Sequence, residues 1–400
     1  MRQRLPDPDR LTGAPRSLEL PRGLYVHIPF CRRKCPYCDF HSVAGEEHPI
    51  DAYVGAVVTD LRRARAEVGA VDLDTIYLGG GTPTVLPPDR IARILDACGR
   101  EFRVGAQAEI TCECNPGTVD LSVLRELRAA GVNRLSIGVQ SFRAEELRFL
   151  GRIHSTDQGR QAVLDAGEAG FGEVSLDLIY CLPGQTPGEW AESLDQALQL
   201  APDHVSAYCL QVEPGTPLAA QAEAGEITPM PDDDQADLYA RTVEHLEAGG
   251  LTQYEISNFA RRGSQCRHNL TYWRNQPHVG AGAGAWGFVD GERRQQVADI
   301  GAYIAGWQAG EPLWAYREVC SGASAANETL MMGLRLCEGL SLPEFRARHS
   351  IDIAAARKAE IDRLSAQGLV SLGDGRLRLT RAGMAVAGEI ATLLAFGEEE

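Results

Sequence analysis

Three closely spaced cysteines are the side chains of this sequence best suited to hold a metal centre. Cys31, Cys35 and Cys38 follow the pattern Cx3Cx2C, directly after an apolar run at residues 24–28 that predicts a β-strand. A [4Fe–4S] cubane takes four cysteine thiolates, so three leave one iron without a protein ligand and free to bind a small molecule. The spacing therefore predicts a reactive iron–sulfur cluster.

Two alternative roles for these cysteines stay open. Structural zinc usually draws on two separated pairs of ligands, although His41 could complete a Cys3His zinc site here. Cysteines without any ligand can also pack as small apolar side chains. The residues between the three thiols are mostly charged and polar, unlike a core segment, so the open cluster is the favoured prediction.

Apolar, β-branched runs alternate with runs of helical period through the first half of the chain. Alternating strands and helices build parallel βαβ units, so the predicted fold class is α/β. About six such units would form an open barrel, although periodicity alone does not separate it from the closed eight-stranded form. The predicted strands cover residues 24–28, 75–78, 108–111, 134–139, 174–179 and 205–210, and the predicted helices cover residues 51–67, 89–97, 121–130, 156–168 and 187–200.

In βα barrels, reactive side chains gather at the carboxyl ends of the strands. The glycines at residues 79–81 follow one predicted strand and would let the backbone pass close to a ligand. They are not a P-loop, because no Gly-Lys-Ser/Thr follows, and Thr84 stands where a dinucleotide fingerprint needs its third glycine. We expect one cleft to collect this segment and three others that follow strands, at residues 113–117, 138–142 and 177–186.

The composition limits the kinds of molecule that the chain is expected to bind. The chain has 400 residues, of which 44% are hydrophobic, and a formal net charge of −16, which argues against binding to nucleic acid or to an anionic membrane surface. No run reaches the roughly 18 apolar residues of a membrane span. Its 11 cysteines occur without an apolar leader, so we expect a reducing cytoplasm rather than a disulfide-rich secreted scaffold.

The alternation of strands and helices fades after about residue 250. The last part predicts a helix over residues 353–367, a turn at residues 373–375, a strand at residues 376–379, Thr380 as a helix N-cap and a final helix to about residue 394. That order resembles a winged helix. Because the chain is acidic, we expect a structural or lid role for this part rather than DNA binding.

The cysteine loop resembles that of the radical S-adenosylmethionine (SAM) enzymes. Residues 25–31, Tyr-Val-His-Ile-Pro-Phe-Cys, are similar to the branch of that superfamily that holds oxygen-independent coproporphyrinogen III oxidases and haem chaperones of HemW type. The resemblance implies a partial (β/α)6 barrel and a [4Fe–4S] cluster whose open iron binds SAM. It also implies SAM contacts for Tyr25, Tyr37, Gly80, Gly81, Thr82, Glu113, Gln140, Arg152 and Asp177.

A second motif, His-Asn-Leu-Thr-Tyr-Trp at residues 268–273, matches the HNxxYW pattern of the chaperone branch. The resemblance implies haem contacts for His268, Tyr272 and Trp273. Imidazole is a common axial ligand of haem iron, and aromatic rings offer flat faces to a porphyrin. A histidine beside aromatic rings is also commonly a hydrogen-bonded packing residue, and that alternative stays open.

Three departures distinguish the chain within this branch. Phe40 stands where the oxidases carry a fourth cysteine, which favours the chaperones. Trp286 replaces the histidine of a Gly-Ala-His segment. Cys181 replaces a glycine in the motif Ile-Tyr-Gly-Leu-Pro-Gly and would place a thiol near the cleft.

The resemblance therefore implies a cytoplasmic haem chaperone that binds the cluster, SAM and haem, and delivers haem to haem proteins. The alternative is an active radical SAM enzyme that oxidises a coproporphyrinogen or transfers a methyl group. The expected domains are a flexible tail (1–20), the radical SAM core (21–250), an extension of strands and loops that carries HNxxYW (251–322) and a C-terminal helical, winged-helix-like part (323–400).

Overall fold

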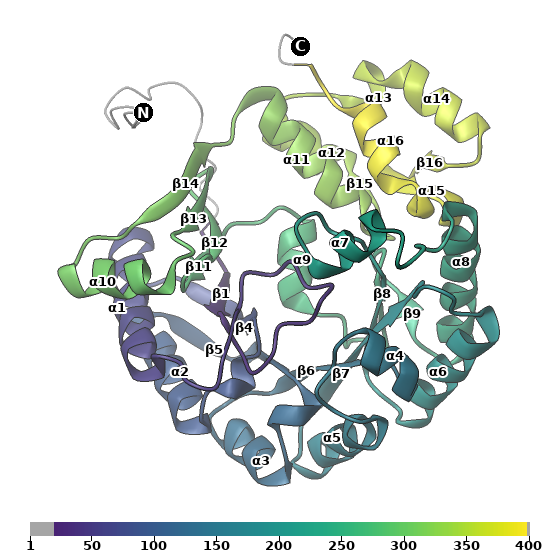
Figure 1. Ribbon diagram of the computed structural model, residues 1–400. Helices are drawn as coiled ribbons and strands as arrows, with labels where there is room; N and C mark the ends of the chain where they lie inside the picture. The colour runs from purple at the N-terminus through teal and green to yellow at the C-terminus, as the bar shows by residue number, and fades with distance from the viewer. Residues whose placement is uncertain (1–19, 398–400) are drawn as a thin grey trace.

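Parallel strands form the wall of an open barrel in the computed structural model, which describes residues 20–397 (Figure 1). They belong to a 12-stranded sheet whose two end strands, β14 and β9, do not pair with each other in the described part of the chain. The barrel is therefore open, as expected for a partial (β/α)6 fold. Its parallel strands, in spatial order, are β1 (Gly23–Ile28), β4 (Asp72–Gly80), β5 (Arg103–Cys114), β6 (Arg134–Gln140), β7 (Glu173–Tyr180) and β8 (His204–Cys209).

Helices cover the outside of this wall, as Figure 1 shows. In α2, apolar residues recur three or four positions apart, so Ile91, Ile94, Leu95 and Cys98 form one buried face. Capping boxes start α5 and α6, in which an N-cap hydroxyl and the side chain three residues later each bond the other's backbone N–H. The helices are α1 (Ile50–Val68), α2 (Pro88–Glu101), α3 (Leu121–Ala129), α4 (Ala144–Phe149), α5 (Thr156–Glu168), α6 (Pro187–Gln199) and α8 (Asp232–Ala248).

Side chains alternate between the two faces of each barrel strand. On β1, Leu24, Val26 and Ile28 are fully buried in the hydrophobic core. The intervening Tyr25 lies on the other face, where its ring stacks on Tyr77 of β4 at 6.2 Å between ring centroids. This period of two gives the barrel an apolar outer layer and leaves polar and aromatic groups for its interior.

Shorter strands extend both ends of the parallel sheet. β10 (Asn258–Ala260) pairs antiparallel with β8, and β9 (Thr252–Gln253) follows it. At the other end β11 pairs parallel with β1 and leads into an antiparallel ribbon. The remaining elements of this extension are β11 (His278–Ala281), β12 (Trp286–Val289), β13 (Glu292–Gln296), β14 (Trp314–Val319), α9 (Arg267–Trp273) and α10 (Ile300–Ala309).

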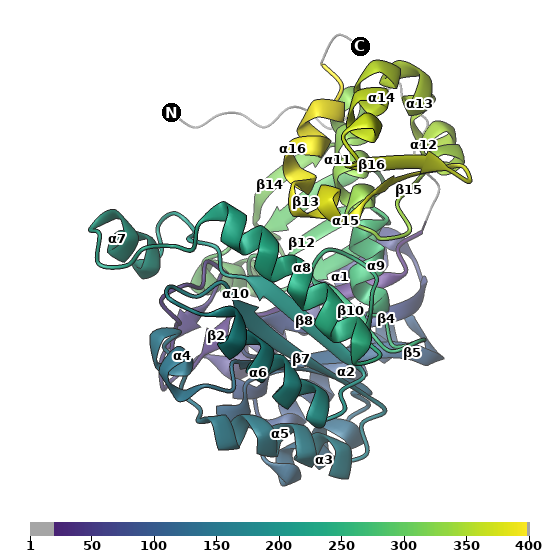
Figure 2. The same ribbon diagram turned by 90° about the vertical axis from the view of Figure 1, so that its right-hand side faces the viewer.

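The C-terminal elements form a small unit of helices and a three-stranded sheet, coloured yellow-green and yellow in Figure 2. Thr380 caps α15 as predicted, because its hydroxyl accepts a hydrogen bond from the Gly383 N–H. Each of the two predicted long helices is interrupted, at Arg357 and at Val386. The elements are α11 (Gly322–Leu334), β15 (Leu340–Ser341), α12 (Leu342–His349), α13 (Ile353–Ala356), α14 (Lys358–Ala366), β16 (Val370–Gly373), β17 (Arg376–Leu379), α15 (Arg381–Ala385) and α16 (Ala387–Leu394).

The predicted tail at residues 1–20 lies outside the described residues, except for its last residue. Within residues 20–397, no helix combines the length and apolar character that crossing a membrane requires.

Candidate functional site

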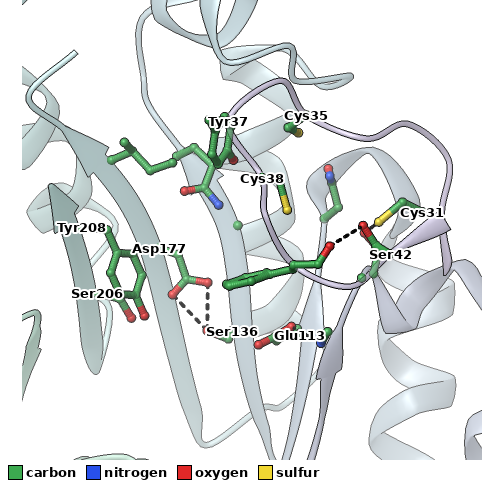
Figure 3. Close-up of a pocket in the computed structure, with 18 of the residues that line it drawn as sticks. Cys31, Cys35, Tyr37, Cys38, Ser42, Glu113, Ser136, Asp177, Ser206 and Tyr208 are labelled. Atoms are coloured by element: carbon green, nitrogen blue, oxygen red, sulfur yellow. Dashed lines mark hydrogen bonds between the residues drawn. The ribbon is translucent and has the colours of Figure 1, made fainter. Parts of the chain in front are cut away.

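A cavity of about 370 Å³ opens where the cysteine loop meets the carboxyl ends of β4 to β8 (Figure 3). It joins the four strand-end segments singled out in the sequence to the cysteine loop. Tyr25 is the one predicted SAM residue that does not line the cavity. The predicted residues that do line it are Cys31, Cys35, Tyr37, Cys38, Gly80, Gly81, Thr82, Glu113, Gln140, Arg152 and Asp177.

The cysteine loop is closed by a short parallel pair, β2 (Phe30–Cys31) with β3 (Val43–Ala44). Its three thiols are free and partly buried, and Figure 3 shows them around the cavity. The Cys31 Sγ lies 3.6 Å from the Thr82 hydroxyl, and the Arg152 Nη1 donates to the Cys35 Sγ at 3.6 Å. Burial raises the pKa of the Cys38 thiol. The loop therefore presents three sulfur donors beside a cation.

The three thiols do not converge on one point among the described residues. Among residues 20–397, no three His, Cys, Asp or Glu side chains are grouped closely enough to share one metal ion. In a cubane each thiolate binds a different iron, so its ligands need not converge on one point. His41, the ligand considered for zinc, does not line the cavity, and its ring stacks on His27 at 5.6 Å between centroids.

The glycines after β4 leave no room for side chains. A Cβ on Gly80 would lie 2.4 Å from the His27 ring, and the φ of Gly80 is 114°, a value that favours glycine. A Cβ on Gly81 would lie 2.7 Å from the Phe30 carbonyl oxygen. The backbone of this turn consequently runs against the cysteine loop.

Two carboxyl groups line the interior of the cavity, Glu113 on β5 and Asp177 on β7, with β6 between their strands. Glu113 accepts hydrogen bonds from the Tyr77 hydroxyl at 2.8 Å and from the Gly80 N–H at 3.1 Å. The hydroxyl of Ser136 bonds both oxygens of Asp177 at 3.0 Å, as Figure 3 shows. Burial raises the pKa of Glu113 to about 7 and that of Asp177 to about 6. Both groups therefore change charge near neutral pH.

Two further side chains keep polar atoms without a partner. The Arg152 Nη2 donates to the Gly138 carbonyl oxygen at 2.8 Å, but its Nε is buried without a hydrogen bond in the described part of the chain. The same holds for the Oε1 of Gln140, whose backbone has a left-handed φ of 66°. Buried polar atoms normally find partners, so these atoms point to a ligand.

The HNxxYW segment forms α9, which adjoins the cavity through Asn269. His268 is fully buried, and its ring stacks on Tyr77 at 5.1 Å between centroids. Its Nδ1 and Nε2 are hydrogen-bonded to the hydroxyls of Thr75 and Tyr272, both at 2.8 Å. Burial lowers the pKa of His268 well below its usual value. Both ring nitrogens are thus engaged, as in a packing histidine.

The other predicted haem residues also stand outside the cavity wall. The Arg335 guanidinium lies 4.4 Å from the ring centroid of Trp273, whose indole N–H is buried without a partner among the described residues. Of the motif, only Asn269 lines the cavity. The predicted haem residues therefore lie outside the cavity that the predicted SAM residues line, and Tyr25, which stacks on His268 at 6.4 Å between ring centroids, is the exception.

The departures from the branch pattern occupy three different places. Phe40, at the position of the fourth cysteine, lines the cavity and is 62% exposed. Trp286 is 42% exposed and pairs with Tyr316 on the antiparallel ribbon, at 5.3 Å between ring centroids. Cys181 is buried at the end of β7.

Sequence reasoning missed several residues of the cavity wall. Tyr77 and Ser136 hydrogen-bond the two buried carboxyl groups, and Arg134, Ser206 and His204 line the cavity. These residues sit inside strands, whereas the predicted cleft segments follow strand ends. Alternation with a period of two, extended back from Gly79 and Gln140, would have found Tyr77, Ser136 and Arg134.

The chain matches the radical SAM superfamily over residues 25–197 and the HemN C-terminal domain over residues 321–386. It is 34% identical to the heme chaperone HemW of Bacillus subtilis, over 92% of this chain and 98% of that protein. It is 38% identical to the heme chaperone HemW of Escherichia coli, over 88% of this chain and 92% of that protein. The solved coproporphyrinogen III oxidase (HemN) of Escherichia coli superposes with a TM-score of 0.81 at 25% identity, covering 95% of this chain and 91% of that one. The chain therefore belongs to the HemW family of radical SAM proteins.

Proposed function

We propose that this chain is a haem chaperone that holds a [4Fe–4S] cluster on Cys31, Cys35 and Cys38 and binds SAM in the adjoining cavity. The observation that carries the proposal is the meeting of the three thiols with unpartnered polar atoms in one cavity. When bound, the cluster supplies an open iron and an electron for SAM. The partly buried thiols and the lack of a fourth cysteine in the loop fit that group.

The cavity residues divide among the chemical groups of SAM. The Glu113 carboxylate suits the ammonium group, because it already accepts two hydrogen bonds that fix its orientation. The Arg152 Nε, which lacks a partner in the described chain, suits the carboxylate. Asp177 and Gln140 suit the ribose hydroxyls. The turn at Gly80, Gly81 and Thr82 brings backbone close enough for the remaining contacts.

Haem binding by His268, Tyr272 and Trp273 is the second half of the proposal. Its support is the HNxxYW motif and the name heme chaperone carried by relatives that are 34% and 38% identical. Because the His268 Nε2 is bonded to the Tyr272 hydroxyl, ligation of iron at that nitrogen requires the hydrogen bond to break. We propose haem-accepting proteins as the partners to which the haem passes.

Haem titration after anaerobic reconstitution tests this half. His268→Ala is expected to weaken haem binding and to change the visible spectrum of the bound haem. His245→Ala is the matched control. That histidine is partly exposed on α8, its side chain is hydrogen-bonded to Asp195, and it does not line the cavity. Equal haem affinity of the wild type and His268→Ala would remove His268 from the haem site.

An active radical SAM enzyme is the second candidate, favoured by the TM-score of 0.81 with coproporphyrinogen III oxidase. Phe40 in place of the fourth cysteine opposes it. The same reconstituted sample, given reductant, SAM and coproporphyrinogen, distinguishes the two candidates. A chaperone should release no substrate-dependent 5′-deoxyadenosine, whereas stoichiometric 5′-deoxyadenosine with loss of carbon dioxide from the substrate would establish the enzyme.

Domain boundaries near residues 250 and 322, a cytoplasmic location and the absence of nucleic-acid binding stay predictions. The acidic net charge of −16 supports the last of these. Limited proteolysis would test the boundaries, because cuts are expected in the segments that join the barrel to the extension and the extension to the C-terminal unit.

A further inference from the structure

Two cysteines outside the cysteine loop meet at one wall of the cavity. Cys181 directly follows β7, and Cys209 is the last residue of the neighbouring strand β8. The strands pair in parallel, with Tyr180 opposite Cys209, and the Leu210 N–H donates to the Tyr180 carbonyl oxygen at 2.8 Å. Figure 3 shows this pair of strands through Asp177 on one and Tyr208 on the other. The two thiols therefore leave the sheet at adjacent strand ends.

Strand pairing sets Cys181 one residue beyond the partner of Cys209, so the two thiols are neighbours across the strand ends. Interaction between the Cys181 and Cys209 thiols lowers the pKa of Cys209 and raises that of Cys181. The Cys209 Sγ also donates to the Gln235 Oε1 of α8 at 3.2 Å. A lower pKa makes Cys209 the better nucleophile of the pair.

The two cysteines differ in exposure, as a reactive pair requires, with one thiol accessible and the other buried. Cys209 is partly exposed and lines the cavity, so a small molecule in the cavity can reach it. Cys181 is only 3% exposed and does not line the cavity. A reagent would consequently meet Cys209 first, with the Cys181 thiol held behind it.

The backbone at Cys181 indicates that its side chain is not a neutral replacement. Its φ is +61°, in the left-handed region that disfavours residues with a Cβ, and the branch motif has glycine at this position. Cysteine thus stands where glycine would relieve strain.

We propose that Cys181 and Cys209 form a reversible disulfide when a hydroperoxide enters the cavity. The Cys209 thiolate attacks the peroxide and becomes a sulfenic acid, while the O–O bond breaks and the distal oxygen leaves as water or alcohol. The Cys181 thiol then attacks the Cys209 sulfur, the S–S bond forms and a second water leaves. The pair loses two electrons and two protons overall, and the peroxide gains them.

The disulfide would change the cavity wall in two ways. It would tie the ends of β7 and β8 together, next to Asp177 and Tyr208. It would also abolish the Cys209 S–H whose hydrogen bond Gln235 now accepts, which removes one contact between the start of α8 and β8. Oxidation would therefore act on the cavity independently of whether the bound ligand is SAM.

Peptide mapping of the full chain after graded hydrogen peroxide tests the proposal. Cleavage after glutamate separates residues 174–189 from the fragment that begins at residue 193, so the linkage appears as a cross-linked pair of fragments. We expect this pair in the wild type, its loss with dithiothreitol, and free Cys98 at the same dose. Oxidised Cys209 with Cys181 still open to alkylation, or no reaction at either cysteine, would overturn the proposal.

Two variants and one control separate the roles. Cys181→Gly should lose the cross-link and convert Cys209 to sulfinic and sulfonic acids that dithiothreitol does not reverse. Cys209→Ser should lose the cross-link and leave Cys181 reduced. Cys98→Ala removes a buried thiol on α2 and should leave the cross-link unchanged. Oxidation of Cys181 in Cys209→Ser at the wild-type dose would contradict the order of attack.

Discussion

Replacing Gly81 by alanine is expected to displace the cysteine loop. The added Cβ would lie 2.7 Å from the Phe30 carbonyl oxygen and 3.0 Å from both the Phe30 nitrogen and the Ile28 carbonyl oxygen. All three are backbone atoms of the segment that leads into Cys31, so no side chain can rotate away to make room. The turn and the loop must instead move apart.

The cost follows from what that movement breaks. The Gly81 N–H donates to the Ile28 carbonyl oxygen and the Thr82 N–H donates to the Phe30 carbonyl oxygen, both at 2.8 Å. Each such bond is worth about 1 kcal/mol net. Forcing an extra methyl into a packed site costs about 1–3 kcal/mol in its own right. We therefore expect the free energy of unfolding to fall by about 3–5 kcal/mol.

Gly99→Ala is the matched control. Gly99 is exposed in α2, and no atom lies within 4 Å of its added Cβ. Alanine there should stabilise the helix by up to about 1 kcal/mol. Urea unfolding measures both effects, and iron and sulfide analysis after reconstitution measures whether the loop still holds a cluster. A Gly81→Ala protein with wild-type stability and wild-type iron content would refute the reasoning.

Two buried carboxyl groups give the remaining predictions. Glu113→Gln should weaken SAM binding at pH 8 by about tenfold or more, because a hydrogen bond to a charged group is lost. In the wild type, the affinity for SAM should fall as the pH drops below the Glu113 pKa of about 7, since only the carboxylate binds an ammonium group. Calorimetric titration with SAM checks both predictions, with a substitution of the exposed Glu126, Glu126→Gln, as the control. A wild-type SAM affinity that does not change with pH would contradict this role of Glu113. Asp60 accepts from the Tyr303 hydroxyl at 2.8 Å and from the Gly282 N–H at 3.1 Å, and burial raises its pKa from 3.8 to about 7. A raised folded-state pKa means that the protonated form is favoured on folding, so the contribution of Asp60 to the free energy of unfolding should be full below pH 3.8 and be lost as the pH rises through about 7. Urea unfolding of the wild type and of Asp60→Asn over this pH range measures that contribution as the difference between the two proteins. A difference that does not change with pH would count against Asp60.

The barrel could be predicted from sequence because each of its strands contains an apolar run that is flanked by helical periodicity. β5 shows where this signal stops: it begins at Arg103, five residues before the predicted start at residue 108. Residues 103–107 carry little apolar character, and their strand geometry comes from pairing with β4, where Asp72 lies opposite Arg103. Register with a neighbour, rather than local preference, extends this strand.

The interruption between α13 and α14 coincides with a contact to a distant part of the chain. The guanidinium of Arg357 donates to the carbonyl oxygens of Leu394 and Ala395, at 3.3 and 2.8 Å. This contact anchors the point between α13 and α14 to the end of α16. A pattern of helical period gives no sign of it, because its partners lie almost forty residues away in the sequence.

The cavity was predictable to the extent that parallel strands share a carboxyl edge. Tyr25 shows the limit of that reasoning, because strand pairing sets it opposite Tyr77, which lines the cavity, and yet Tyr25 does not. Its hydroxyl is hydrogen-bonded to the His27 Nδ1 at 2.9 Å rather than directed into the cavity. Two tyrosines at the same level thus differ because their hydroxyls bond different partners, His27 and Glu113, which the sequence alone does not state.

Register also connects the two motifs that lie far apart in the sequence. The His268 ring stacks on Tyr77, the Tyr77 hydroxyl donates to Glu113, and Glu113 accepts from the Gly80 N–H. Three contacts therefore run from the HNxxYW helix to the glycine turn beside the cysteine loop. A ligand that draws His268 out of this packing removes support from Tyr77 and, through it, from the Glu113 carboxylate. Haem at His268 and SAM at Glu113 would consequently influence each other's affinity, by the same factor in both directions.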